Sequence, residues 1–182
     1  MKQTVYFLLI FSSVFVFSSC TQKPVAPDLS KAVIIVSPSI PAPMNSTAPQ
    51  VLAEEVAKRT SLQLQIADNW DAKTIIVLAL STDKDLDGKV LPAAGSGLPE
   101  LKKEGFRLVY SEENGKNILW IIGADARGVL YGIGKLLRIA EMEEGNFILP
   151  EAVNLTSSPE YPLRGHQFGY RNTANSWDAW TV

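Results

Sequence analysis

One acidic loop carries residues whose types and spacing can bind a hard cation. In order along the chain they are Asp83, Asp85, Asp87 and Gly88, which read as D-x-D-x-D-G. Carboxylates at alternate positions, followed by a glycine, open the calcium-binding loop. That loop also needs a bidentate glutamate at its twelfth position, where this chain has Ala94. We therefore expect a solvated acidic turn here, and a calcium site is the less favoured alternative.

Histidine and cysteine chemistry is limited, because the chain has one residue of each type, His166 and Cys20. A zinc site or a Ser-His-Asp triad cannot be assembled around a single histidine without geometry that a sequence does not show. A single cysteine also excludes an internal disulfide. We expect no metal, no cofactor and no catalytic residue in this chain. His166 is expected to be structural or to line a substrate site.

The N-terminus has the features of an export signal. Lys2 precedes an apolar stretch over residues 5–17, which is too short to cross a bilayer as a permanent helix. The Ser-Ser-Cys sequence that ends at Cys20 resembles the lipobox of bacterial lipoproteins, whose cysteine is lipidated. We expect residues 1–20 to be a lipoprotein signal peptide, residues 21–30 to be a tether, and Cys20 to hold the protein on a membrane. The alternative is an ordinary secretory signal that happens to contain a cysteine.

These features predict a location in the bacterial cell envelope. Thr21 follows the cysteine, where an acidic residue often retains lipoproteins at the inner membrane, so we expect the outer membrane. The formal net charge is −2, and the lysines and arginines are scattered. Since nucleic-acid-binding proteins carry a clustered basic surface, no nucleic acid partner is expected.

Three segments in the first half of the chain have the patterns of strands. Residues 32–36 form a short apolar run rich in β-branched side chains, which is typical of a buried strand. Residues 62–66 alternate apolar and polar side chains, which indicates one solvated face. Residues 74–80 are almost continuously apolar, so we expect both faces of this strand to be covered in the middle of a sheet.

The second half of the chain contains a hairpin signal. Asn114-Gly115 lies between two β-type runs, residues 106–110 and 118–122. Because asparagine and glycine adopt the backbone angles of tight hairpin turns most readily, these runs are expected to pair antiparallel. A last short strand is expected at residues 147–149.

Two helices are expected between these strands. The first is predicted to start at Ser46 or Thr47, either of which can cap it, with Pro49 in its first turn. Leu52 and Val56 give this helix an apolar face.

The second helix is the clearest element in the sequence. Asp125 can cap it, and it is predicted over residues 126–140. Gly128 and Gly132 lie four residues apart on one side of it, where they would let another backbone approach closely. Its apolar side chains fall at helical spacing and are Val129, Leu130, Ile133, Leu136, Leu137 and Ala140.

The order of these elements predicts the fold class. Strands and helices alternate first, and a hairpin, a helix and a short strand follow. This order favours an α/β (α+β) fold, in which helices pack on one mixed β-sheet. We place this domain at residues 31–155.

Two motifs stand in a fixed order near the end of this domain. The first is G-A-D-A-R-G-V-L-Y-G at residues 123–132, and the second is P-E-Y-P-L-R-G at residues 159–165. Together they resemble the noncatalytic N-terminal domain shared by β-hexosaminidases of glycoside hydrolase family 20 and by α-glucuronidases. In those enzymes the domain packs against a catalytic (β/α)8 barrel. The resemblance implies a β-hexosaminidase domain 2-like fold, with residues 156–182 as the linker and first strand of a truncated barrel.

The resemblance also implies a sugar site. Arg164 matches the arginine with which hexosaminidases bind the hydroxyl groups of the sugar, and a guanidinium offers a fixed fork of donors for this task. Hexosaminidases have an aspartate where this chain has Gly169, so specificity for N-acetylhexosamine is not implied. The expected substrate-binding residues are Arg164, His166, Tyr170 and Arg171.

Two tryptophans close to the end of the chain have two interpretations. Trp177 and Trp180 stand among polar residues, and such rings stack on the faces of sugars. They are equally compatible with core positions of the first barrel helix.

The chain is too short to hold the catalytic machinery of a glycosidase. Hydrolysis needs two carboxyl groups at the scissile bond, or one and a substrate acetamido group, and a whole barrel takes about 250 residues. We therefore expect this chain alone to be inactive. The leading prediction is the N-terminal accessory domain of an exported, lipid-anchored glycoside hydrolase that acts on oligosaccharides or polysaccharides. The alternative is a noncatalytic surface lipoprotein that binds a glycan or a partner protein.

Overall fold

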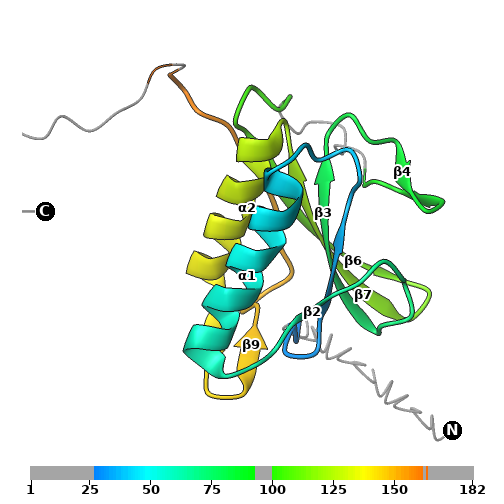
Figure 1. Ribbon diagram of the computed structural model, residues 1–182, viewed down its shortest axis with the longest axis vertical. Helices are drawn as coiled ribbons and strands as arrows, with labels where there is room; N and C mark the ends of the chain where they lie inside the picture. The colour runs from blue at the N-terminus through cyan, green and yellow to red at the C-terminus, as the bar shows by residue number, and fades with distance from the viewer. Residues whose placement is uncertain (1–26, 93–99, 162, 164–182) are drawn as a thin grey trace, which may run out of the picture.

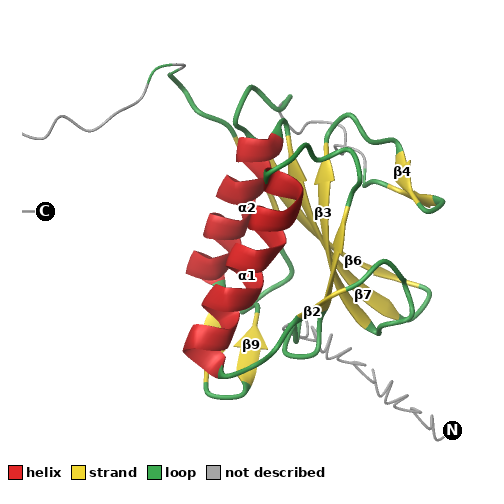
Figure 2. Cartoon of the chain, in the orientation of Figure 1, coloured by secondary structure: helices red, strands yellow, loops and turns green. Residues whose placement is uncertain are grey.

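Six strands form one mixed sheet, and both helices pack on the same face of it (Figures 1 and 2). The structure is a computed structural model, which describes residues 27–92, 100–161 and 163. The predicted fold class, helices on a mixed sheet, is confirmed. Within the described residues, neither helix has both the length and the apolar character that crossing a membrane requires.

The sheet has the strand order β10-β6-β7-β3-β1-β2. Its strands are β1 (Val33–Val36), β2 (Gln65–Ile66), β3 (Thr74–Leu80), β6 (Phe106–Glu113), β7 (Lys116–Gly123) and β10 (Asn154–Ser157). The helices are α1 (Met44–Thr60) and α2 (Ala126–Ile139). Two further hairpins consist of β4 (Asp85–Leu86) with β5 (Lys89–Val90), and β8 (Glu141–Glu143) with β9 (Asn146–Ile148).

Parallel and antiparallel pairing meet at β7. Strand β1 pairs in parallel with β2 and β3, and β3 pairs in parallel with β7. Strand β6 pairs antiparallel with β7 across Asn114 and Gly115, whose φ angles are 52° and 76°. Both residue types tolerate this left-handed conformation, so the predicted hairpin is confirmed. As its apolar run predicts, β3 lies inside the sheet with nearly all of its side chains buried.

The helical face of the sheet carries the larger core. Helix α2 buries Val129, Ile133 and Leu137 on this face, as their helical spacing predicts. Leu119 and Ile121 of β7 belong to the same cluster and are fully buried. Burial of an aliphatic side chain of this size contributes about 1.5–3 kcal/mol. Helix α2 is therefore held flat on the sheet by its apolar face.

The other face of the sheet is covered without a helix. Trp120 of β7 is fully buried there, with its ring centroid 5.9 Å from that of Trp70. The indole N–H of Trp70 donates to Asp87 Oδ2 at 3.2 Å, which ties the β4–β5 hairpin to this layer. Loops thus close the second core, and both faces of β3 are buried.

The prediction for the start of α1 is wrong. The helix begins at Met44 after Pro43, and neither Ser46 nor Thr47 caps it. The Ser46 hydroxyl donates to the Pro43 carbonyl at 2.9 Å, which turns it away from the orphan N–H groups. Pro49 therefore lies inside the helix instead of in its first turn.

One strand prediction also needs correction, and two strands of the structure are not predicted. The alternation over residues 62–66 yields only the two-residue edge strand β2, in which Ile66 is 49% exposed. Short edge strands leave side chains uncovered, because nothing packs beyond them. The sequence pattern predicts neither β8 nor β10, since both are short and lack clear alternation.

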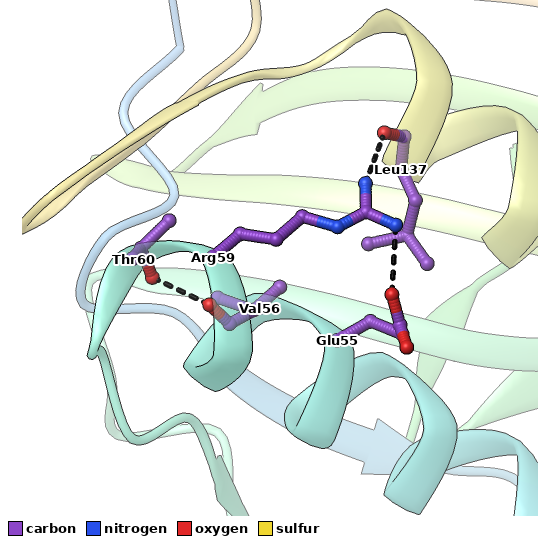
Figure 3. A network of polar contacts seen from close by, with 5 residues as sticks. All are labelled: Glu55, Val56, Arg59, Thr60 and Leu137. Atoms are coloured by element: carbon purple, nitrogen blue, oxygen red, sulfur yellow. Dashed lines mark hydrogen bonds and ion pairs between the residues drawn. The ribbon is translucent and has the colours of Figure 1, made fainter.

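A polar network joins the C-terminal ends of the two helices (Figure 3). The Arg59 guanidinium donates to the Leu137 carbonyl of α2 at 3.3 Å and to Glu55 Oε2 at 2.7 Å. The Thr60 hydroxyl donates to the Val56 carbonyl at 2.7 Å and closes the last turn of α1. The two helices are thus fixed to each other at this end.

Candidate functional site

The described chain leaves the domain beside the first turn of α2. We call this region the joint and define it as the loop 102–105, the first turn of α2 and residues 157–161. Ser157 of β10 pairs with Phe106, and Ser158 Oγ accepts a hydrogen bond from the Lys102 N–H at 3.1 Å. Leu163, just beyond, is 90% exposed. The joint therefore fixes the position at which the described chain leaves the domain.

One carboxylate holds two parts of the joint together. Asp125 precedes α2 in an extended conformation, and its Oδ1 accepts the Gly128 N–H at 2.9 Å. Its Oδ2 accepts the Glu104 N–H at 2.9 Å. A capping carboxylate satisfies an orphan N–H of the helix and interacts favourably with the positive end of the helix dipole. Here it also ties the helix to loop 102–105.

Glycine makes the close contact in the joint possible. A Cβ atom on Gly128 would lie 2.2 Å from the carbonyl oxygen of Gly105, and one on Gly132 would lie 2.6 Å from Ile121 Cγ2. The Gly105 carbonyl also accepts the Ala124 N–H at 2.9 Å. The predicted close approach of another backbone is therefore confirmed at Gly128, whereas the close neighbour of Gly132 is the Ile121 side chain.

An ion pair crosses the surface of the joint. Arg127 Nη1 lies 2.9 Å from Glu104 Oε1, and the two side chains are 69% and 15% exposed. The hydrogen bond and the charge of Glu104 raise the pKa of the Arg127 guanidinium above its usual value. The charge of the Glu104 carboxylate is thus balanced by Arg127.

The joint contains a pocket with a volume of about 300 Å³. Its walls carry three cationic side chains, two carboxylates and an aromatic ring, and Tyr161 is 66% exposed. The lining residues are Lys102, Lys103, Glu104, Arg127, Pro159, Glu160 and Tyr161.

The comparison with protein families identifies the chain. Residues 21–136 match the family described as glycosyl hydrolase family 67 N-terminus. The chain belongs to this family. The resemblance to a glycoside hydrolase N-terminal domain is confirmed, and no curated protein matches the chain.

One solved structure agrees with this fold. A family GH115 4-O-methyl-alpha-glucuronidase with specificity for decorated arabinogalactans is 21% identical, with a TM-score of 0.54. That alignment covers 74% of this N-terminal domain chain and 18% of the enzyme. The GH20 beta-N-acetylhexosaminidase from Streptomyces coelicolor A3(2) is 16% identical, with a TM-score of 0.49, and the alignment covers 76% and 24% of the two chains. The chain thus spans less than two thirds of either enzyme.

The predicted substrate and lipidation residues lie outside the described part of this N-terminal domain chain. They are Cys20, Arg164, His166, Tyr170 and Arg171. The pocket of the joint adds residues that the sequence analysis missed, among them Lys102, Lys103 and Tyr161. The available signals were a lysine pair just before a strand and a tyrosine between two prolines.

The acidic loop forms turns of its own. Asp83 Oδ2 accepts the Leu80 N–H at 2.9 Å, and Asp85 Oδ1 accepts the Gly88 N–H at 3.2 Å. Asp87 and Gly88 form the turn between β4 and β5 with φ angles of 51° and 73°. Among the described residues, no three His, Cys, Asp or Glu side chains are arranged to hold a metal ion. The carboxylates of Asp83 and Asp85 therefore accept backbone hydrogen bonds that stabilise the turns of this loop.

Proposed function

We propose that this chain is the N-terminal accessory domain of an exported, lipid-anchored glycoside hydrolase that acts on oligosaccharides or polysaccharides. The match of residues 21–136 to a glycoside hydrolase N-terminal family supports the accessory-domain part of this proposal. The export and the anchor rest on the N-terminal sequence that ends at Cys20. In this proposal residues 156–182 connect the domain to the first strand of a catalytic (β/α)8 barrel. The barrel supplies the carboxyl groups that cleave the glycosidic bond.

The accessory domain contributes position and no bond cleavage. Its joint holds β10, loop 102–105 and α2 together by hydrogen bonds and close backbone contact. A rigid support of this kind keeps binding residues in a productive geometry. Arg164 follows the joint directly and would bind sugar hydroxyls, with His166, Tyr170 and Arg171 beside the same sugar.

The two ends of the described chain support a role as a spacer. Residue 27 bonds to Leu149, next to β9 at one end of the domain, and the chain leaves past Ser158 at the other (Figure 1). A lipid on Cys20, followed by a tether that ends before residue 27, would enter at the end near β9, since Leu29 is buried and its N–H donates to the Phe147 carbonyl. The barrel would then stand on the side away from the outer membrane that holds the lipid.

The test starts from the gene, by reading the frame beyond codon 182 and expressing the protein that it encodes. We expect a frame long enough for a barrel, and a product that releases sugar from at least one of two substrates, a glucuronic-acid-decorated arabinogalactan or a chitin oligosaccharide. We also expect incorporation of labelled palmitate, which the Cys20→Ser variant abolishes. A stop codon directly after codon 182 would contradict the enzyme and favour a binding lipoprotein. Unchanged labelling of the variant would contradict the anchor.

A further inference from the structure

The pocket of the joint is lined by more cationic side chains than its carboxylates can neutralise. Glu104 is engaged by Arg127, whereas the ammonium groups of Lys102 and Lys103 make no hydrogen bond or ion pair with the described residues. Of the two carboxylates that line the pocket, only Glu160 is then left to balance the charges of the two lysines. Both lysines are exposed, so their charges remain accessible to a ligand in solution. The pocket thus presents a net positive surface.

The surface beside the pocket continues this character along α2. Helix α2 contains no acidic residue, and Arg127, Tyr131, Lys135 and Arg138 follow one another at helical spacing along its outer side. Tyr131 is 41% exposed and lies one turn from Arg127. Cations and an aromatic ring therefore extend from the pocket toward the far end of the helix.

The size and lining of the pocket indicate what can occupy it. Its volume of about 300 Å³ lies at the lower end of the range for small-molecule sites, about 300–1,000 Å³, and suits a single sugar unit. The exposed ring of Tyr161 offers an apolar face on which a pyranose can stack. The two ammonium groups offer donors to a carboxylate.

We propose that the pocket of the joint binds a uronate unit of an acidic polysaccharide, with Lys102 and Lys103 on its carboxylate and Tyr161 against its ring. Neighbouring units of the chain would run along α2 past Tyr131. Anionic lipid is the less favoured ligand, because a concave pocket with an aromatic wall encloses a ring better than it meets a flat surface. The choice of a polysaccharide rests on the proposed function.

Binding is measured directly, by calorimetric titration of the purified full chain with a short oligogalacturonide. The probe for charge is the same oligosaccharide in methyl-esterified form, which keeps the sugar rings and removes the carboxylates. We expect the ester to bind at least about fivefold more weakly, as for the loss of two exposed ion pairs, and added salt to weaken the acidic ligand alone.

Variants locate the site. Lys102→Ala with Lys103→Ala should weaken oligogalacturonide binding by about fivefold, and the pair of Lys→Arg variants should restore it. The matched control is Lys31→Ala with Lys58→Ala, two exposed lysines outside the pocket that remove the same charge. Tyr161→Ala should weaken binding of the acid and the ester alike. The backbone bonds of Lys102 do not involve its side chain, so the variants should retain the fold.

Several results would overturn the proposal. These are equal binding of acid and ester, an equal loss in the control pair, no binding, or tighter binding to vesicles of anionic phospholipid than to oligogalacturonide. Because the titration measures binding without hydrolysis, any of these results leaves the enzyme proposal intact. Conversely, an inactive full-length protein that still binds the acid would contradict the proposed activity alone.

Discussion

Gly128 and Gly134 belong to the same helix but have different surroundings. A Cβ atom on Gly128 would meet the Gly105 carbonyl oxygen at 2.2 Å, whereas one on Gly134 would meet nothing within 4 Å. Gly128→Ala should therefore destabilise the protein by about 1–3 kcal/mol through overpacking. Gly134→Ala should stabilise it by about 0.5–1 kcal/mol, because alanine favours the helix. Urea unfolding checks both changes, and equal effects of the two substitutions would contradict the close contact in the joint.

Two substitutions of Asp125 separate what its two carboxylate oxygens contribute to stability. Asp125→Ala removes the helix cap and the bond to the Glu104 N–H, and we expect a loss of about 2 kcal/mol in the free energy of unfolding. Asp125→Asn keeps one oxygen for the cap, so about half of that loss is expected. Urea denaturation measures the difference. If the Asp125→Asn variant is as stable as the unmodified protein, the hydrogen bond from the Glu104 N–H contributes nothing to the free energy of unfolding.

At the scale of elements, Arg59 couples the end of α1 to the end of α2. Arg59→Ala removes the bond to the Leu137 carbonyl and should cost about 1 kcal/mol. Glu55→Gln removes only the surface ion pair, for which about 0.3 kcal/mol is expected. Lys58→Ala, an exposed neighbour on the same turn, should change stability by less than about 0.5 kcal/mol and serves as the control. An effect of Arg59→Ala no larger than that of Lys58→Ala would show that the two helix ends are not coupled through this side chain.

The elements that the sequence predicts are those with a strong local signal. The apolar run of β3, the Asn114-Gly115 turn and the spacing along α2 each dictate their structure through neighbouring residues alone. Strand β10 has no such signal, because its four residues are fixed by pairing with β6, more than forty positions away. The start of α1 depends on whether the Ser46 hydroxyl bonds to a free N–H group of the helix or to the Pro43 carbonyl, and the sequence does not reveal this choice.

The same reasoning explains what the sequence shows of the candidate site. The glycine and aspartate positions of the joint are visible in the sequence, because a close approach and a helix cap restrict residue type. The pocket is not visible, since Lys102 and Tyr161 meet only after β10 returns to the sheet beside β6. Its chemistry comes from tertiary contact between segments that are distant along the chain.

At the scale of the whole molecule, the accessory domain matters through the chain that follows it. Loop 102–105, α2 and β10 fix the starting point of the connector with several independent contacts. Under the proposed function, loosening the joint should therefore lower the activity of the full-length enzyme, because small displacements of binding residues reduce the rate. In the sequence, Arg164 is the first charged residue after the joint.

Arg164→Ala in the full-length enzyme tests that link. If the guanidinium binds sugar hydroxyls, its loss should lower kcat/KM by about 10–100-fold, which corresponds to about 1.5–3 kcal/mol for a charged hydrogen bond. Arg164→Lys keeps the charge but not the planar fork of donors, so it should recover only part of the activity. Lys31→Ala, at an exposed lysine outside the joint and outside α2, is the control for a lost surface cation and should leave kcat/KM unchanged. Since residues 33–157 form the sheet and both helices, the melting temperature should stay the same in all three variants. An unaltered kcat/KM in Arg164→Ala would remove this residue from the sugar site and leave the joint with a purely structural role.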